Sequence, residues 1–123
     1  MSTTAKAENM YYVGEYEWGT IYANDRDPNA GGASHEYRIH LDNGEVQEIR
    51  FQHGPRNVEG STRGILDEHL IQVLADRLRA FQAGPFAHPS DARALAHIEA
   101  ASAALRERAA ERRARGVLGK NEK

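Results

Sequence analysis

The sequence predicts an α+β fold in which a small N-terminal antiparallel β-sheet is followed by a C-terminal antiparallel two-helix hairpin that oligomerises. Two observations support this class. Residues 10–51 are rich in aromatic and β-branched side chains and hold an Asn-Gly pair between two alternating segments. Residues 65–115 instead repeat apolar side chains at spacings of three and four, which is the period of an amphipathic helix.

The length and composition of the chain indicate one small domain. It has 123 residues, 40% of them hydrophobic, and no cysteine, so a modest core without disulfides is expected. We expect a disordered N-terminus at 1–9, a sheet region with a pocket loop at 10–64, the hairpin at 65–116 and a tail at 117–123. No run approaches the roughly 20 apolar residues that span a bilayer, and no signal-peptide pattern opens the chain. These features predict a soluble, cytoplasmic protein.

The sheet region is expected to begin with one strand over residues 10–20. Gly14 and Gly19 interrupt it, so the strand should bend or bulge at a glycine. Residues 24–34 collect Asn, Asp, Pro and Gly, which favour turns, and should form an exposed loop.

A hairpin completes the predicted sheet. Segments 37–41 and 46–51 flank Asn43 and Gly44, and an Asn-Gly pair favours a tight turn because both residues tolerate positive φ. Three strands alone are only marginally stable, so this sheet should lean on helices or on another subunit.

The clearest predicted helix covers residues 65–81. Its wide apolar face comprises Leu66, Leu70, Val73, Leu74, Arg77, Leu78 and Phe81. Gly84 and Pro85 end it, Ser90 is the expected N-cap of a second helix, and Gly116 is a suitable left-handed stop.

The second helix carries a heptad-like seam for packing against the first helix. Its members are Leu95, Ile98, Ser102, Leu105 and Ala109. Most neighbouring positions are alanine, which allows close approach but buries little apolar area. Assembly of several hairpins would supply the missing burial.

Charge is distributed unevenly along the chain. Residues 1–60 carry a net charge of −5 and residues 61–123 carry +3, which argues against broad binding of duplex DNA. At the end of the second helix, Arg108, Arg112 and Arg115 continue the face of Leu105. Two interpretations stand: paired guanidinium groups that hold phosphates, or a solvated helix end whose cations complement the macrodipole.

The segment 51–64 connects the predicted sheet to the first helix. Its polar side chains are Gln52, His53, Arg56, Asn57 and Arg63. Loops on a rigid scaffold often carry binding groups, so this segment is a candidate pocket wall; a plain polar crossover is the alternative.

Chemical motifs are scarce. The histidines are His35, His40, His53, His69, His88 and His97. None pairs with a second ligand four residues away on one helix face, so no metal site is predicted. Phosphate loops, nucleophile elbows and close carboxylate pairs are also missing from the sequence, and no cofactor or catalytic residue is predicted.

Four residues in the helical region suggest a nucleotide pocket: Phe81, Asp91, Arg108 and Arg112. About 20 residues at about 1.5 Å each separate Asp91 from Arg112, so one hairpin cannot bring them together. Two antiparallel hairpins could place the aromatic ring of one copy opposite the guanidinium groups of the other, which would suit a nucleotide with a diphosphate.

Three sequence motifs carry a family resemblance. They are FQHGP at 51–55, DRLRAFQAGPFA at 76–87 and ALAHIEAASAALRERAAERRARGVLG at 94–119. In these motifs the chain resembles the phage anti-Thoeris and anti-CBASS cyclic-nucleotide sponges, which share a helical-hairpin domain. The resemblance implies a non-enzymatic protein in the infected bacterial cytoplasm that sequesters glyco-cyclic ADP-ribose isomers, with cyclic di- or trinucleotides in separate pockets of hexameric members.

The resemblance also implies roles for individual residues in a homo-oligomer, dimer or hexamer. Phe81 would stack on adenine, and Arg108 and Arg112 would hold the phosphates. The loop would add polar contacts from Gln52, Gly54, Pro55 and Arg56. The family has Asn at the start of the second helix where this chain has Asp91, whose carboxylate would repel a diphosphate unless it contacts ribose hydroxyls.

Two other functions remain open at this stage. An enzyme that cleaves the messenger would need an acid or base, for which His53, His88 and Asp91 are the candidates. An arginine-rich module could instead bind RNA or an acidic protein surface, with steep salt dependence. The sponge interpretation predicts neither nucleic-acid polymers nor membranes as partners.

Overall fold

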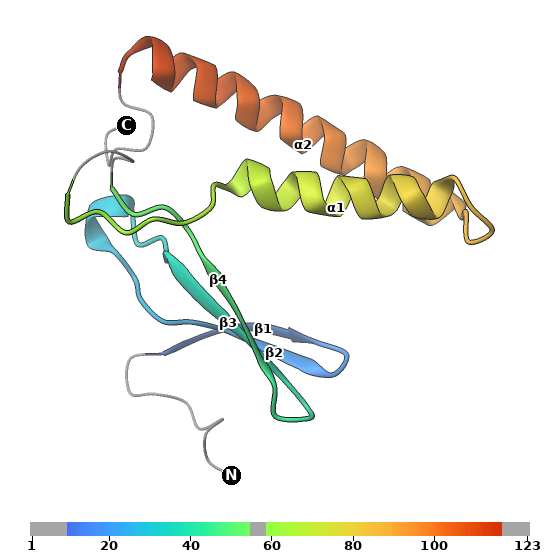
Figure 1. The fold of residues 1–123 in the computed structure, drawn as a ribbon, viewed down its shortest axis with the longest axis horizontal. Coiled ribbons are helices and arrows are strands. Elements are labelled where there is room, and N and C mark those ends of the chain that lie inside the picture. Colours follow the sequence, from blue (N-terminus) through green and yellow to red (C-terminus); the bar gives the residue numbers. More distant parts are fainter. Residues whose placement is uncertain (1–9, 55–58, 117–123) are drawn as a thin grey trace. The chain divides into compact units, whose positions relative to one another are not determined.

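The computed structural model describes residues 10–54 and 59–116 of the chain. It divides between Gly64 and Ile65 into two compact units, which we call the sheet unit and the hairpin unit. Four antiparallel strands form the first and two long helices form the second (Figure 1), which confirms the predicted α+β class. Within the described residues, neither helix is long and apolar enough to cross a membrane. The expected disordered N-terminus at 1–9 and tail at 117–123 lie outside the described residues.

The sheet unit is a meander with strand order β1-β2-β3-β4, in which each strand pairs antiparallel with the next. The strands are β1 Tyr11–Tyr16, β2 Gly19–Ala23, β3 Glu36–Leu41 and β4 Val46–Arg50. Between β3 and β4, Gly44 has φ +93° and donates its N–H to the Leu41 carbonyl at 3.0 Å. The hairpin predicted from the Asn-Gly pair is therefore confirmed.

The prediction of a single strand over residues 10–20 was wrong. Residues 10–20 form part of two strands joined by a tight turn, with Glu17 at φ +47°, so the sheet has four strands and not three. Glutamate is not a typical positive-φ residue, which is why composition did not reveal this turn. The predicted irregularity at a glycine is confirmed, because the register of β1 against β2 shifts between Tyr12 and Gly14.

The predicted exposed loop at 24–34 is more structured than expected. It contains the short 3-10 helix η2, Pro28–Ala30, with Asp27 as N-cap. Ser34 is buried, accepts a hydrogen bond from Arg26 Nη1 at 2.7 Å and donates one to the Asp25 carbonyl. The composition predicted turns in this segment. It did not predict that polar side chains would be buried through these hydrogen bonds.

The hairpin unit consists of α1, Asp67–Gln82, and α2, Pro89–Ala114. The N-cap of α2 is His88 and not Ser90, because the Ser90 N–H donates to His88 Nδ1 at 3.0 Å. Pro89 then occupies the first helical position, where a missing N–H costs nothing. After the C-cap residue, Gly116 has φ +75°, as expected of a left-handed stop.

The seam predicted on α2 is confirmed, whereas the wide apolar face of α1 is largely exposed. All five seam residues of α2 are buried or half-buried. On α1, the one buried residue is Ala75, while Val73 is 56% exposed and Leu74 is 43% exposed. In the described parts of the chain, Met10, Ala23 and Ala75 are the only buried hydrophobic residues. The hydrophobic core that the described residues form within a single chain is therefore very small.

Candidate functional site

A polar cluster holds the two helices in register. Glu68 Oε2 accepts hydrogen bonds from Ser102 Oγ at 2.6 Å, Gln72 Nε2 at 2.6 Å and Arg106 Nε at 2.8 Å. The Ser102 hydroxyl, followed by the Gln72 amide and the Arg106 guanidinium, lowers the pKa of Glu68 to about 2. This charge-assisted cluster lies at the start of α1 and fixes which residues of α2 lie opposite it.

The end of α2 has an excess of positive charge. Residues 105–116 contain five arginines and two glutamates. Glu111 contacts two of the arginines, since its carboxylate lies 3.2 Å from Arg108 Nη1 and 3.0 Å from Arg115 Nε. The hydrogen bond from Arg115 is the main reason why the pKa of Glu111 is lowered. Arg112 is half-buried and continues the spacing of the α2 seam. An anion bound at this end would compete with Glu111 for Arg108.

The opposite end of the hairpin carries the aromatic candidate. Phe81 lies in the last turn of α1, is 40% exposed, and has the Arg77 guanidinium carbon 5.6 Å from its ring centroid. Asp91 is half-buried in the first turn of α2. An exposed ring beside a cation provides a surface on which a base can stack.

One hairpin does not bring the four helical candidates together. Phe81 and Asp91 lie at the end where the helices connect, whereas Arg108 and Arg112 lie near the C-terminal end of α2. Figure 1 shows that the helices connect at one end of the hairpin and that α2 ends at the other. About 26 Å of helix separates Asp91 from Arg108 at about 1.5 Å per residue. A site that uses both ends must combine two copies of the chain.

The loop candidates belong to the sheet unit, where Gln52 has a structural role. Gln52 Nε2 donates to the Gly54 carbonyl at 2.9 Å, and Gln52 Oε1 accepts the Gly64 N–H at 3.2 Å. Gly54 has φ +92°, which favours glycine. Pro55 and Arg56 lie outside the described residues. Gln52 therefore connects the two ends of the loop.

Sequence reasoning missed a cluster of side chains in the sheet unit. Asp27, His35 and His53 place one potential ligand atom each within 4.8 Å of the others. The search for paired ligands on one helix face could not find them, because they come from the connection between β2 and β3 and from the segment after β4. The turn-rich composition around Asp27 was the available signal.

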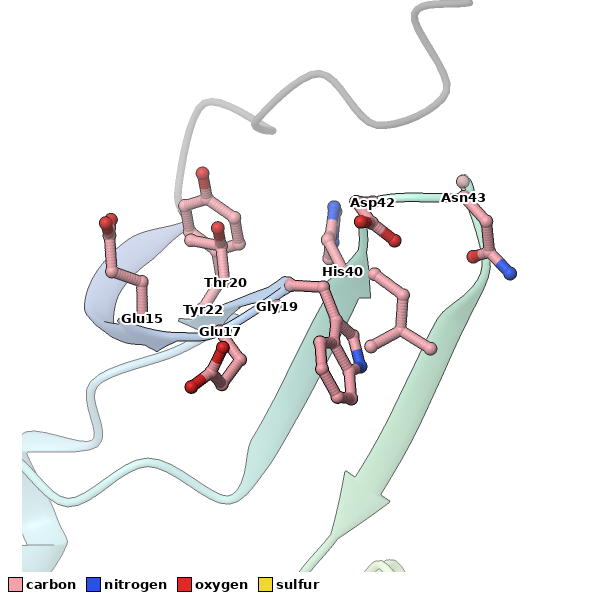
Figure 2. Close-up of a pocket in the computed structure, with 11 residues that line it drawn as sticks. Glu15, Glu17, Gly19, Thr20, Tyr22, His40, Asp42 and Asn43 are labelled. Atoms are coloured by element: carbon pink, nitrogen blue, oxygen red, sulfur yellow. The ribbon is translucent and has the colours of Figure 1, made fainter.

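A cavity of about 790 Å³ lies at the end of the sheet where the β1–β2 and β3–β4 turns meet (Figure 2). Its lining includes Trp18, Tyr22 and His40 together with the carboxylates of Glu15, Glu17 and Asp42. Among the described residues, the lining contains these three carboxylates and neither lysine nor arginine, so this cavity does not suit a nucleotide with its phosphates.

Comparison with known proteins identifies the hairpin. The family described as Acb2/Tad1, hairpin domain, matches residues 43–110, more than half of the chain. A protein of Bacillus phage SBSphiJ7 named Thoeris anti-defense 1 is 36% identical over 93 residues, which is 76% of this chain and 65% of the relative. The matched residues therefore span slightly less than two thirds of that relative. The family match includes the loop, Phe81, Asp91 and Arg108, and ends before Arg112.

Proposed function

Because this chain belongs to the Acb2/Tad1 hairpin family, as its motifs predict, we propose that it is a phage anti-defence sponge. It binds cyclic nucleotide immune signals and sequesters them without cleaving them. The ligands we propose are glyco-cyclic ADP-ribose isomers and, in a hexameric assembly, cyclic di- or trinucleotides. The observation that carries the proposal is the family match, which covers the loop, α1 and α2 as far as residue 110, together with the anti-defence name of the phage relative.

In the proposed site, two hairpins pack side by side and antiparallel, so that the Phe81 end of one copy lies beside the arginine end of the other. Arg108 and Arg112 of one copy bind the diphosphate, and Phe81 of the other copy stacks on the adenine. The five-to-two excess of arginine over glutamate at residues 105–116 supports an anion at this end. Asp91 accepts hydrogen bonds from ribose hydroxyls, because a carboxylate is an acceptor and would repel the phosphates.

The exposed apolar face of α1 supports the homo-oligomer that this site requires. Val73, Leu74 and Phe81 lie on one side of the helix and are each at least 40% exposed. Burying a large apolar side chain is worth roughly 1.5–3 kcal/mol, so covering this face with a second copy stabilises both chains. We propose a dimer as the smallest functional unit.

One of the acid-base candidates, His88, has a structural role, which supports binding without cleavage. His88 Nδ1 accepts the Ser90 N–H as the N-cap of α2. A ring nitrogen that caps a helix cannot also accept a substrate proton.

The experiment that separates a sponge from an enzyme is recovery of the ligand. The protein is incubated with a glyco-cyclic ADP-ribose isomer or a cyclic dinucleotide, denatured by heat, and the released compound is identified by chromatography. We expect the intact cyclic compound in an amount equal to that bound. A linear product would show that the protein cleaves its ligand.

A further inference from the structure

Three potential metal ligands meet in the sheet unit. His35 Nε2 lies 3.0 Å from Asp27 Oδ2, and His53 Nε2 lies 3.3 Å from the same oxygen. The two imidazole rings are stacked, with centroids 4.0 Å apart and an interplanar angle of 11°. Asp27 precedes η2, His35 precedes β3 and His53 follows β4, so the cluster joins the connection between β2 and β3 to the segment after β4.

We propose that Asp27, His35 and His53 bind a divalent transition-metal ion, for which Zn²⁺ is the best match. Two imidazole nitrogens and one carboxylate oxygen are a common donor set for zinc. Ligand atoms about 2.0–2.2 Å from one tetrahedral ion lie about 3.4 Å apart, close to the two distances from Asp27 Oδ2. Three protein ligands leave the fourth position to water.

The backbone around the cluster already orients two of the ligands. Asp27 Oδ1 accepts the Asn29 N–H at 2.9 Å, which directs Oδ2 toward the histidines. The His35 N–H donates to Asp25 Oδ1 at 2.9 Å. Such supporting hydrogen bonds around the ligands are typical of metal sites.

Binding requires a movement that the structure permits. The lone pairs of two parallel rings do not converge on one point, so one ring must turn. The side chain of His53 is 45% exposed and has room to do so, whereas the side chains of Asp27 and His35 are 11% and 15% exposed. The metal therefore binds to a nearly fixed pair of ligands, and His53 closes onto it.

A metal ion bound to this cluster would hold the loop that follows β4 at a second point. His53 and Thr62 exchange two backbone hydrogen bonds of 2.9 Å at the base of this loop. A metal ion would connect this base to the segment that contains Asp27 and His35. The sheet unit buries few hydrophobic residues, so an ion that binds only the folded form stabilises it.

The test uses the full chain after dialysis against EDTA and then metal-free buffer, titrated with ZnCl₂ alone by calorimetry. We expect one Zn²⁺ per chain and a melting temperature that rises with Zn²⁺ and falls again with EDTA. His53→Ala and Asp27→Asn should each weaken binding at least about 10-fold, because even residues that only support a ligand have effects of that size. Asp27→Asn keeps an oxygen for the Asn29 N–H, so the cap of η2 is preserved.

His97→Ala is the matched control, because His97 is exposed on α2 in the hairpin unit. It should bind Zn²⁺ like the wild type. The proposal is overturned if the wild type binds Zn²⁺ no more tightly than His53→Ala, or if His97→Ala loses as much affinity. The same holds if Zn²⁺ leaves the melting temperature unchanged. No cyclic nucleotide is present, so this result is independent of the proposed sponge activity.

Discussion

The two faces of α1 differ in a way that is unusual for a helix in a single folded chain. The face toward α2 contains Glu68, Gln72 and Ala75, and it meets the small polar Ser102. The opposite face presents Val73 and Leu74 to solvent. In a self-sufficient hairpin the apolar residues would lie between the helices and the polar residues outside.

This difference indicates a division of roles. Hydrogen bonds from Ser102, Gln72 and Arg106 to Glu68 fix the register of the helices but bury little apolar surface. The outer face holds the apolar surface that remains available for assembly. On this account, the hairpin is positioned by its inner face and stabilised through its outer face.

The strongest test of this division replaces the apolar side chains of the outer face. In a two-fold interface each substitution is present in both copies, so its effect on the free energy of association is doubled. At roughly 1.5–3 kcal/mol per buried side chain, Val73→Asp combined with Leu74→Asp should weaken self-association by more than about a thousandfold. The mass of the particle can be measured by light scattering after gel filtration.

Ala104→Asp is the control for this double variant, because Ala104 is exposed on α2. It should leave the assembly intact. Equal masses for the wild type and the Val73→Asp, Leu74→Asp variant would show that the outer face is not the interface.

The second prediction concerns the arginine end of the hairpin. Arg108→Ala or Arg112→Ala should preserve the fold and weaken binding of a cyclic ADP-ribose isomer by about 1.5–3 kcal/mol each, the range for a charged hydrogen bond. This corresponds to roughly 10- to 150-fold in the dissociation constant by calorimetry. Arg113→Ala removes the same charge about 100° around the helix and should have a much smaller effect. Unchanged affinity in both test variants would exclude these arginines from the site.

A third prediction tests the sheet unit, where two glycines offer a matched pair. A Cβ at Gly64 would lie 2.5 Å from the Arg50 carbonyl oxygen, whereas a Cβ at Gly14 would have no atom within 4 Å. Gly64→Ala should therefore destabilise the protein by about 1–3 kcal/mol, as overpacking does. Gly14→Ala should change the free energy of unfolding much less. Similar denaturation midpoints for both variants would refute the close approach.

The smallest expected effect is the pH dependence of the inner face. The pKa of Glu68 is about 2 in the folded hairpin, below its ordinary value of 4.5. A lowered folded-state pKa means that the stabilisation is complete above about pH 4.5 and is lost as pH falls through about 2. Glu68→Gln should remove this part of the pH dependence of thermal unfolding, followed by circular dichroism. An identical acid profile in wild type and variant would show that the cluster contributes nothing.

Much of this fold could be predicted from spacing alone. The apolar residues of the α2 seam repeat at spacings of three and four, and the Asn-Gly pair favours a tight turn between two strands. The turn between β1 and β2 could not be predicted, because Glu17 adopts positive φ without a typical turn residue. Periodicity identified the apolar stripe of α1, but a period does not show which surface covers that stripe.

Less of the candidate site than of the fold could be predicted from the sequence. Helical spacing indicated the arginines at positions 108 and 112, but the ligand proposed for them was inferred from the family resemblance. Asp27, His35 and His53 were not recognised together, because ligands in separate loops have no characteristic spacing. The structural use of Gln52 also depends on a contact with Gly64, twelve residues away, that only the folded chain reveals.

The proposed function requires that the hairpin bind a cyclic nucleotide between two copies of the chain. Calorimetric titration of the assembled protein with glyco-cyclic ADP-ribose isomers, and separately with cyclic dinucleotides, tests it most directly. We predict saturable binding whose stoichiometry matches pockets shared by two protomers, and loss of that binding in the Val73→Asp, Leu74→Asp variant. Absence of binding to every one of these compounds, or undiminished binding by a monomeric variant, would contradict the account.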